Sequence, residues 1–401
     1  MVDDGISLVG MARLMKMAFD GIDLAPIAVK LIARASADEQ DAEALMDLST
    51  LLQLQGKREV GLAAQAHALK IKRLYELPAR GEAAIRLLAI MAPGDLMTNT
   101  PLPFLLEDSD VSLGMLYLLP GEPIPSELPV CDAVFIAVAE SDSVRGLHRG
   151  LAGSVGSWGR PVLNLPDRIV NTSRTQAYQL LDAAAGVSIP MTTRTPRDAL
   201  ERLSIDGLAI GELLSDGVFP VIVRPVNSHA GRGLARVDAA HDMAAYLQAT
   251  AGDEFFISRF IDYRGEDGLF RKYRIVLVDS VPYPAHMGVS AHWMIHYLNA
   301  GMTDSASKRA EEEAFMRDFA HGFGRRHAEA LRTVAERFGL DYLVIDCAET
   351  PDGELLVFEV CTGAVVHAMD PPDLFPYKPP HMARIFDAFR AMLARATGAL
   401  P

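Results

Sequence analysis

The sequence predicts an α/β protein that begins with an all-α helical segment, and three observations lead to this class. From about Ile6 to Ile90, apolar residues recur at three- and four-residue spacing, which is typical of amphipathic helices. From Thr98 onward, short apolar runs alternate with loops and helical patterns, as in sheets that are covered by helices. Between Asp341 and Cys361, two apolar strands flank a Pro-Asp-Gly turn.

Length, charge and composition exclude several classes of protein. The chain has 401 residues, which suggests two or three packed units, and half of the residues are hydrophobic. A formal net charge of -14 would repel a nucleic-acid backbone, so we expect no nucleic-acid partner. No run of about eighteen apolar residues could cross a membrane, and the N-terminus lacks the pattern of a signal peptide, so we expect a cytoplasmic protein.

The helical segment is predicted to form a first domain over residues 1–100. Part of it matches a tetratricopeptide-type helical hairpin, in which Gly56 would separate the two helices. An ordinary helical bundle explains the same pattern equally well. The residues that match the hairpin are Leu45, Leu48, Ser49, Leu52, Gly61, Gln65 and Ala68.

Residues 101–170 are predicted to form a second unit, a small α/β layer. Short apolar runs that are bounded by turn residues predict its strands. These strands are expected at Val111–Leu119, Ala133–Ala139 and Pro161–Leu165.

Helix starts mark the rest of the chain. Ser173 and Gln176 have the spacing of a capping box, which predicts a helix from Ser173. Thr195 is expected to cap a second helix, because a proline follows it. A long charged stretch from Ser307 to Phe338 is expected to be helical.

The C-terminal hairpin places two carboxylates opposite each other. If Asp352 and Gly353 form a two-residue turn, counting outward along the strands pairs Asp346 with Glu359. Directly opposed side chains lie about 4.5–5.5 Å apart at their β-carbons, so two like charges would repel. A bridging divalent cation would remove the repulsion and suits oxygen ligands. The alternative is that one carboxylate pairs with an arginine or that the register slips.

A glycine-containing loop follows the strand Phe219–Pro225. The loop, Ser228–Gly233, contains two glycines and leads into a returning strand. Such a loop can bring backbone N–H groups against phosphate oxygens, and Arg224 at its base supplies positive charge. A plain hairpin connection is the alternative explanation.

The order of these pieces resembles the ATP-grasp superfamily, in the style of the ribosomal-protein glutamate ligases and D-alanine ligases. The resemblance rests on a basic helix start at Arg174, the strand that ends in Arg224-Pro225, the glycine loop and the carboxylate hairpin. It covers roughly residues 171–362. It implies an α+β ATP-grasp fold, with a small lid subdomain over 171–262 and a C-terminal core over 263–401.

The resemblance implies roles for residues of a nucleotide site. Arg174 and Arg224 would hold the ATP phosphates, and the glycine-loop residues Ser228, His229, Gly231 and Gly233 would cover them. The backbone of a hinge made of Ser258, Arg259, Phe260 and Ile261 would read the adenine. Asp262 or Glu266 would bind the ribose.

The resemblance also implies the chemical centre. Arg274 would steady an acyl phosphate, whereas Lys272 stands where the family often has an aspartate. Asp346 and Glu359 match the family's metal ligands for Mg²⁺, or for Mn²⁺ in its place. Cys361 stands where an asparagine is usual.

The implied function is an ATP-dependent carboxylate–amine ligase that forms an amide bond through an acyl phosphate and releases ADP and phosphate. Its substrates would be small-molecule or peptide carboxylates and amines. A protein partner at the N-terminal helices and a homodimer are left open. The alternatives are a phosphotransferase that uses the same ATP site, and a nucleotide-binding interaction protein whose site is degenerate.

Several histidines are candidates for the substrate pocket. His286, His292 and His296 share parity, so on a continuous strand they would face one way. With Lys272 and His367, they could line the pocket of the acceptor. Ordinary packing or hydrogen bonding is the alternative for each histidine.

Overall fold

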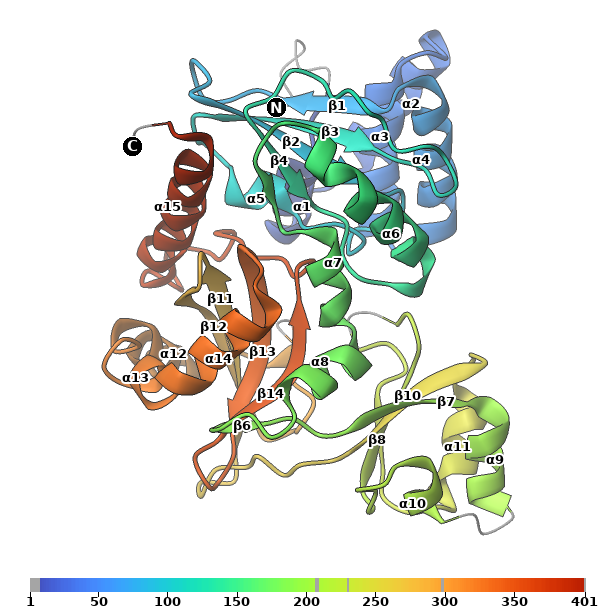
Figure 1. Ribbon diagram of the computed structural model, residues 1–401, viewed down its shortest axis with the longest axis vertical. Helices are drawn as coiled ribbons and strands as arrows, with labels where there is room; N and C mark the ends of the chain where they lie inside the picture. The colour runs from blue at the N-terminus through green and yellow to red at the C-terminus, as the bar shows by residue number, and fades with distance from the viewer. Residues whose placement is uncertain (1–7, 206–208, 229–230, 297–298, 400–401) are drawn as a thin grey trace.

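The computed structural model of the chain describes residues 8–205, 209–228, 231–296 and 299–399. It is an α/β structure with three sheets and an N-terminal set of helices. In Figure 1, the first sheet and the N-terminal helices lie at the top, the third sheet lies below them, and the second sheet lies at the lower right. This arrangement agrees with the predicted fold class.

Four helices open the chain: α1 (Met11–Phe19), α2 (Ala25–Ala37), α3 (Ala42–Leu54) and α4 (Arg58–Ile71). Gly56 lies between α3 and α4 at a φ of 77°, as predicted for the helical hairpin. A Cβ at Gly61 would come within 2.9 Å of the Ser49 carbonyl oxygen, so only glycine lets the two helices approach this closely. The tetratricopeptide identity of the hairpin stays a prediction.

The first sheet corrects the sequence prediction for residues 72–90. The helical pattern ends at Ile71, and two strands follow before residue 100. The central strand β2 is parallel to both of its neighbours and is covered on both faces, so it reads as a continuous apolar run without period-two alternation. The strands, in the order β1-β3-β2-β4-β5, are β1 (Leu74–Leu77), β3 (Val111–Tyr117), β2 (Ile85–Met91), β4 (Ala133–Ile136) and β5 (Val162–Leu163).

Short helices connect this sheet to the rest of the chain. They are α5 (Leu102–Leu105), α6 (Arg145–Ser154) and α7 (Pro166–Ile169), with 3₁₀ turns at Asp142–Val144, Val155–Ser157 and Val170–Thr172. The helix α8 (Arg174–Leu181) then begins after Ser173 as predicted. The Ser173 side chain makes no capping hydrogen bond, so the predicted capping box is wrong.

The second sheet, here called the lid sheet, packs around a small core of its own. Thr195 lies inside one of its strands, so the predicted helix begins at Arg197, one residue later than expected. A strand pairing to β10 outweighs the local capping signal. The strands, in the order β7-β10-β8-β9, are β7 (Thr192–Pro196), β10 (Glu254–Arg259), β8 (Val221–Pro225) and β9 (Ala235–Val237). The helices are α9 (Arg197–Ile205), α10 (Ile210–Leu213) and α11 (Asp242–Ala249).

The third sheet carries the C-terminal hairpin. The predicted helix from Ser307 to Phe338 is broken into three helices, and Gly339 ends the last of them at a φ of 56°. The strands, in the order β12-β11-β13-β14-β6, are β12 (Val281–Ser290), β11 (Phe270–Val278), β13 (Tyr342–Glu349), β14 (Leu355–Cys361) and β6 (Val187–Ser188). The helices are α12 (Ala306–Arg317), α13 (Phe323–Arg326), α14 (Ala328–Phe338) and α15 (Lys378–Thr397).

One face of the third sheet is divided into an apolar, a charged and a second apolar band. Val276 and Val344 belong to the large core that α15 shares with the first sheet. Phe270 and Leu356, toward the other end of the same strands, belong to a separate apolar cluster. Charged side chains occupy the middle, because residues 272, 274 and 346 lie between these two clusters along their strands.

In the part of the chain that the structure describes, no helix combines the length and the low polarity that crossing a bilayer requires.

Candidate functional site

The hairpin confirms the predicted pairing of Asp346 with Glu359, although the turn differs from the predicted one. Thr350 and Glu354 flank a three-residue loop, with the Thr350 N–H donating to the Glu354 carbonyl at 3.0 Å. That loop shifts the register by one residue near the turn. A bulge at Phe358 shifts it back, so that Asp346 again faces Glu359.

Four ionisable side chains form a row across the third sheet, here called the charged row. Strand register pairs His286 of β12 with Arg274 of β11, Arg274 with Asp346 of β13, and Asp346 with Glu359 of β14. Directly paired residues of antiparallel strands project from the same face. The charged row therefore crosses four strands on one face of the sheet, and it lies between the two apolar bands of that face.

Asp346 is the centre of the charged row and is held by two cations. Arg274 donates from Nε to Oδ1 at 2.8 Å and from Nη2 to Oδ2 at 3.0 Å, and Lys272 Nζ lies 2.8 Å from Oδ2. Burial by itself would raise the pKa of Asp346, but the charges of Arg274 and Lys272 hold it well below its usual range. The alternative in which a carboxylate pairs with an arginine is therefore the arrangement observed.

The donor set does not fit a divalent ion that bridges Asp346 and Glu359. Both oxygens of Asp346 already accept from Lys272 and Arg274, and only the Glu359 side chain, which is 41% exposed, remains open to solvent. Among the described residues, no three or more His, Cys, Asp and Glu side chains are placed to hold a metal ion together.

Cys361 is not a substitute ligand. It lies two residues after Glu359 on the same strand, and burial, with the nearby charges of Glu359 and Asp346, raises its thiol pKa to about 12. The thiol therefore stays protonated at neutral pH, and a neutral thiol is a poor ligand for a hard cation.

Two arginines from different elements converge at the Glu359 end of the row. Arg174, at the start of α8, donates from Nη1 to the Phe358 carbonyl at 3.2 Å, and its Nη2 lies 3.1 Å from Glu359 Oε2. Arg224, on the lid sheet, is close enough that burial and the charge of Arg174 together lower its pKa to about 10. Two guanidinium groups held together in this way have the charge and the donors that suit an anion.

The glycine loop joins the lid sheet to the charged row. The Arg224 guanidinium donates from Nε to the Ser228 hydroxyl at 3.3 Å and also contacts the Ser228 carbonyl. Gly231 has a φ of 69°, and a Cβ there would lie 2.0 Å from His296 Nε2. Gly233 has a φ of 66°, and a Cβ there would lie 2.7 Å from Pro225 Cδ. The predicted loop residue His229 lies outside the described residues.

The predicted adenine hinge lies beside an apolar cluster. Ser258 and Arg259 belong to β10, and the chain leaves the sheet at Phe260, whose N–H donates to the Pro220 carbonyl at 3.0 Å. Phe260 and Ile261 pack against the cluster that contains Leu356 and Phe270, and Phe260 makes an edge contact with Trp293 at 5.8 Å between ring centroids. A flat aromatic base would find apolar surface here.

The two predicted ribose-binding residues lie on the loop after this hinge. Asp262 accepts from the Arg264 backbone N–H at 3.1 Å and pairs with its guanidinium at 3.3 Å. Glu266 is exposed. Their role in binding stays a prediction.

Beyond His286, the charged row continues into a buried network that sequence reasoning missed. Glu312 of α12 is fully buried and accepts from the Tyr377 hydroxyl at 2.7 Å, with His286 Nδ1 2.6 Å away. Lys378 Nζ lies 3.2 Å from Glu312 and 3.1 Å from Asp370. The charged sequence around Glu312 is typical of a solvated helix, so this position did not signal burial.

The remaining histidines do not share one strand. β12 ends at Ser290, so His292 and His296 lie in the following loop and the parity prediction is wrong for them. His292 is exposed, whereas His296 lies near Lys272 and Asp346. His367 lies in the loop after β14, against Phe19 of α1 at 5.8 Å between ring centroids. Burial, and then the charges of Lys378 and His286, lower the pKa of His367 to about 3.

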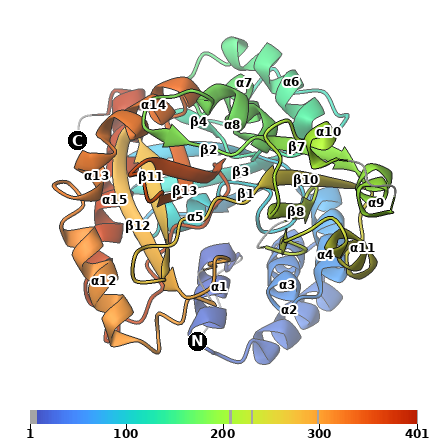
Figure 2. The ribbon, with the colours of Figure 1, turned by 90° about the horizontal axis from the view of Figure 1, so that it is seen from below.

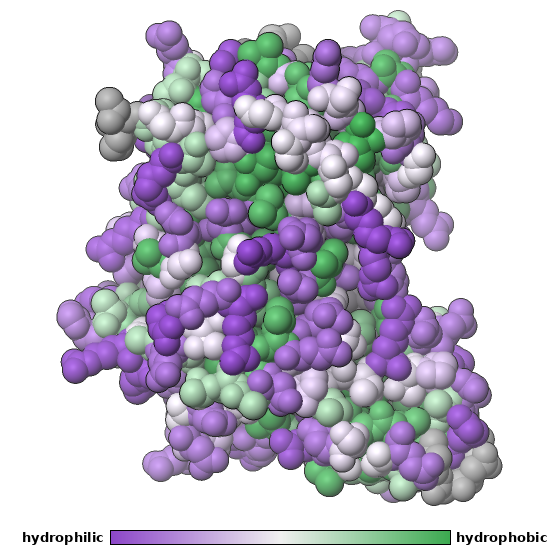
Figure 3. All heavy atoms as spheres, in the orientation of Figure 1, coloured by the Kyte–Doolittle hydropathy of each residue, from purple (hydrophilic) through white to green (hydrophobic). Residues whose placement is uncertain are grey.

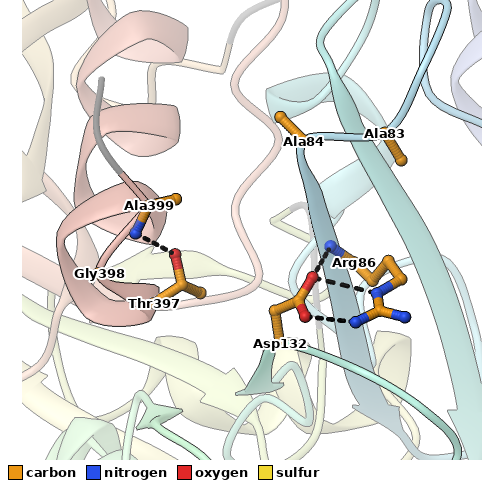
Figure 4. Close-up of a pocket in the computed structure, with 7 residues that line it drawn as sticks. All are labelled: Ala83, Ala84, Arg86, Asp132, Thr397, Gly398 and Ala399. Atoms are coloured by element: carbon orange, nitrogen blue, oxygen red, sulfur yellow. Dashed lines mark hydrogen bonds and ion pairs between the residues drawn. The ribbon is translucent and has the colours of Figure 1, made fainter.

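A surface hollow of about 490 Å³ lies elsewhere, between the start of β2 and the end of α15 (Figure 4). Arg86 and Asp132 face each other in it, with Arg86 Nη2 2.6 Å from Asp132 Oδ1, so each charge neutralises the other. The hollow shares no residue with the charged row. Its lining consists of Ala83, Ala84, Arg86, Asp132, Thr397, Gly398 and Ala399.

Comparisons with known proteins return similar solved structures at low identity. The VanG D-Ala:D-Ser ligase from Enterococcus faecalis is 13% identical over 77% of this chain and 99% of its own, with a TM-score of 0.47. A D-alanine–D-alanine ligase from Bacillus anthracis complexed with ATP is 14% identical over 79% and 99%, with a TM-score of 0.45. A RimK domain ATP-grasp protein from Sphaerobacter thermophilus is 16% identical over 78% and 99%, with a TM-score of 0.40.

No protein-family model matches the chain, and no curated protein matches it. At the identities and TM-scores above, the similar structures alone assign neither a family nor a reaction. The proposals below therefore rest on the geometry of the charged row and the glycine loop.

Proposed function

We propose that the chain is an ATP-dependent ligase of the ATP-grasp type, which activates a carboxylate as an acyl phosphate and passes it to an amine. The observation that carries this proposal is the meeting of the charged row with the glycine loop. Gly231 of the loop packs on His296, beside Lys272 and Asp346, while Arg224 at the base of the loop lies beside Arg174. In Figure 2, the lid strands β8 and β10 lie across the centre of the molecule from β11, β12 and β13.

The charges at this meeting point suit a polyphosphate. Four cations, Arg174, Arg224, Lys272 and Arg274, surround two carboxylates, Asp346 and Glu359. The local excess of positive charge would offset the negative charge of a nucleotide triphosphate. Phe260 and Ile261 pack against the apolar cluster of Phe270 and Leu356, which would offer apolar surface to the base of such a nucleotide.

The proposed chemistry uses this chain's own cations to hold developing negative charge. A carboxylate oxygen of the first substrate forms a bond to the γ-phosphorus while the bond to the β-phosphate oxygen breaks, which leaves an acyl phosphate and ADP. The amine then forms a bond to the acyl carbon and loses a proton, and phosphate leaves. Arg274 uses three of its N–H donors on Asp346 and the Val365 carbonyl, so of the roughly five that arginine carries it retains donors for the acyl phosphate. Closure of the glycine loop would keep water away from the intermediate.

A substrate screen tests the proposal. ATP consumption is measured against amino acids, small peptides and polyamines, with mass spectrometry of the products. An amide product with equal amounts of ADP and phosphate supports the ligase. A stable phosphorylated product without consumption of an amine would instead establish the phosphotransferase, and nucleotide binding without turnover against any acid–amine pair would establish the binding protein.

The N-terminal helices remain a proposed site for a protein partner. On the described part of these helices and their loops, Ile22, Val29, Ile32 and Val60 are each more than half exposed, at 51%, 67%, 51% and 59%. Figure 3 shows one face of the molecule, on which hydrophilic side chains surround smaller hydrophobic areas. A pull-down with purified wild type and with the Val29→Ser, Ile32→Ser variant tests this surface.

Gly231→Ala is expected to lower ATP turnover by roughly tenfold to a hundredfold. A Cβ at Gly231 would lie 2.0 Å from His296 Nε2 and would push the glycine loop away from the charged row. Steady-state ATP turnover is measured. Gly121→Ala is the matched control, because Gly121 also has a positive φ of 84° but has open space around its Cβ position. Equal losses in both variants would trace the effect to backbone strain and contradict the loop contact.

A further inference from the structure

Two facing carboxylates require positive charge close by, and the structure supplies that charge from the protein. Lys272 lies two residues before Arg274 on β11 and therefore projects from the same face of the sheet. Its ammonium group lies 2.8 Å from Asp346 Oδ2, and its side chain is only 23% exposed. The charge of Lys272 also reaches Glu359 and helps to lower the pKa of that carboxyl group, after the larger effects of Arg174 and Arg224.

The position of the ammonium group conflicts with a metal ion at Asp346. A divalent ion that used Asp346 Oδ2 would share that oxygen with the ammonium group, and the two like charges would lie only a few ångströms apart. An ion at Asp346 Oδ1 would meet the same ammonium charge across the carboxylate group, next to Arg274, which donates to Oδ1 at 2.8 Å and to Oδ2 at 3.0 Å. Of the carboxylate pair, only Glu359 is left to contact a metal ion that the nucleotide brings with it.

We propose that Lys272 is a built-in cation that takes the place of a metal ion between Asp346 and Glu359, so that the site binds its nucleotide with a single divalent ion. The inference rests on the proposed function insofar as it concerns the nucleotide. The part that concerns Lys272 and the two carboxylates stands on their geometry alone. Replacing the ammonium group with an uncharged side chain leaves Arg274 Nη2 as the one donor to Asp346 Oδ2 among the described residues, so that this oxygen and Glu359 can hold a metal ion together.

Mn²⁺ counting by electron paramagnetic resonance tests this inference in two arms. In the first arm, Mn²⁺ alone is added to the nucleotide-free protein. We expect Lys272→Met to bind Mn²⁺ about tenfold or more tightly than wild type, because the competing charge is gone. In the second arm, the non-hydrolysable analogue AMP-PNP is present at saturation. We expect one Mn²⁺ per bound nucleotide in wild type and two in Lys272→Met.

Two control variants accompany these measurements. Lys272→Arg keeps the positive charge and should retain the stoichiometry of wild type. Lys72→Met removes an exposed lysine that pairs with Glu43 on the helical segment, far along the chain from the row, and should change neither arm. Circular dichroism establishes that each variant is folded, and the wild-type stoichiometry alone decides the second arm if Lys272→Met does not fold.

Each outcome decides one part of the inference. Two Mn²⁺ ions per nucleotide in wild type would overturn it, and so would equal Mn²⁺ affinity of wild type and folded Lys272→Met without nucleotide. If AMP-PNP does not bind to wild type but Lys272→Met gains a Mn²⁺ site, the role of Lys272 is upheld and the proposed function fails.

Discussion

Replacing Asp346 with asparagine is expected to lower ATP turnover by at least about a hundredfold and the free energy of unfolding by about 3 kcal/mol. Asp346 is 7% exposed and is the shared partner of Lys272 and Arg274. Without its charge, the two cations stay together on the sheet and lose the carboxylate that contacts both of them, with the charge of Glu359 left to offset them in part. From the sequence alone, replacing Asp346 would be expected to raise the free energy of unfolding, because removing one of two facing carboxylates relieves their repulsion. The two cations bound to Asp346 reverse that expectation.

Urea denaturation and steady-state ATP turnover measure the two effects of Asp346→Asn. Asp318→Asn is the control, because Asp318 also pairs with an arginine but is 60% exposed, and it should change neither quantity. Adding Lys272→Met to Asp346→Asn removes one of these two cations and should restore part of the stability but not the turnover. An Asp346→Asn protein that unfolds at the same urea concentration as wild type would refute the role of Asp346 as counterion.

The same contribution of Asp346 has a defined dependence on pH. Since the folded state holds the pKa of this carboxyl group well below its usual range, folding favours the ionised form. Its stabilising effect is complete above the ordinary aspartate pKa of about 3.9 and is lost as the pH falls below that value toward the folded pKa. The difference in stability between wild type and Asp346→Asn should therefore stay constant from neutral pH to about pH 5 and shrink below about pH 4.

The sequence predicts the hairpin pairing better than it predicts the turn. Asp346 faces Glu359 because the three-residue loop and the bulge at Phe358 shift the register in opposite directions. Local turn rules cannot reveal a bulge, because a bulge depends on how both strands pack. Strand alternation and the Asp-Gly signal led to the correct pairing of Asp346 with Glu359. The pairing is correct because the longer loop and the bulge, neither of which was predicted, shift the register in opposite directions.

The pairing of strands that are distant in the sequence determines the contacts of Asp346, which local sequence patterns could not predict. Lys272 and Arg274 reach Asp346 because β11 pairs with β13, over a separation of 72 residues for Arg274 and Asp346. From the sequence alone, Arg274 was a candidate for steadying an acyl phosphate, and Lys272 was a departure from a family pattern and a candidate for the acceptor pocket. Nothing in the spacing of these residues indicated that both would share one carboxylate. The strand β2 was missed for a related reason, since burial on both faces removes its alternation.

Arg224→Ala is expected to weaken ATP binding by about thirtyfold or more, because a charged donor to the phosphates would be lost. Burial and the neighbouring Arg174 lower the pKa of Arg224 to about 10, so the guanidinium group remains charged at neutral pH. The proximity of two like charges disfavours the ligand-free state, and a bound phosphate would relieve the repulsion. Isothermal titration with AMP-PNP measures the affinity.

Arg224→Lys separates the charge of this residue from its geometry. Lysine is the usual residue in the family that the sequence resembles, which by itself predicts that much of the affinity remains. The structure changes that expectation, because the guanidinium group contacts both the hydroxyl and the carbonyl of Ser228 and thereby fixes the glycine loop. A lysine keeps the charge but cannot reproduce that planar fork. We therefore expect Arg224→Lys to bind AMP-PNP about tenfold more weakly than wild type, between wild type and Arg224→Ala.

Arg332→Ala, which removes an exposed arginine paired with Glu336 on α14, should bind as wild type does. Equal affinity of Arg224→Ala and wild type would show that the phosphates do not bind at Arg224.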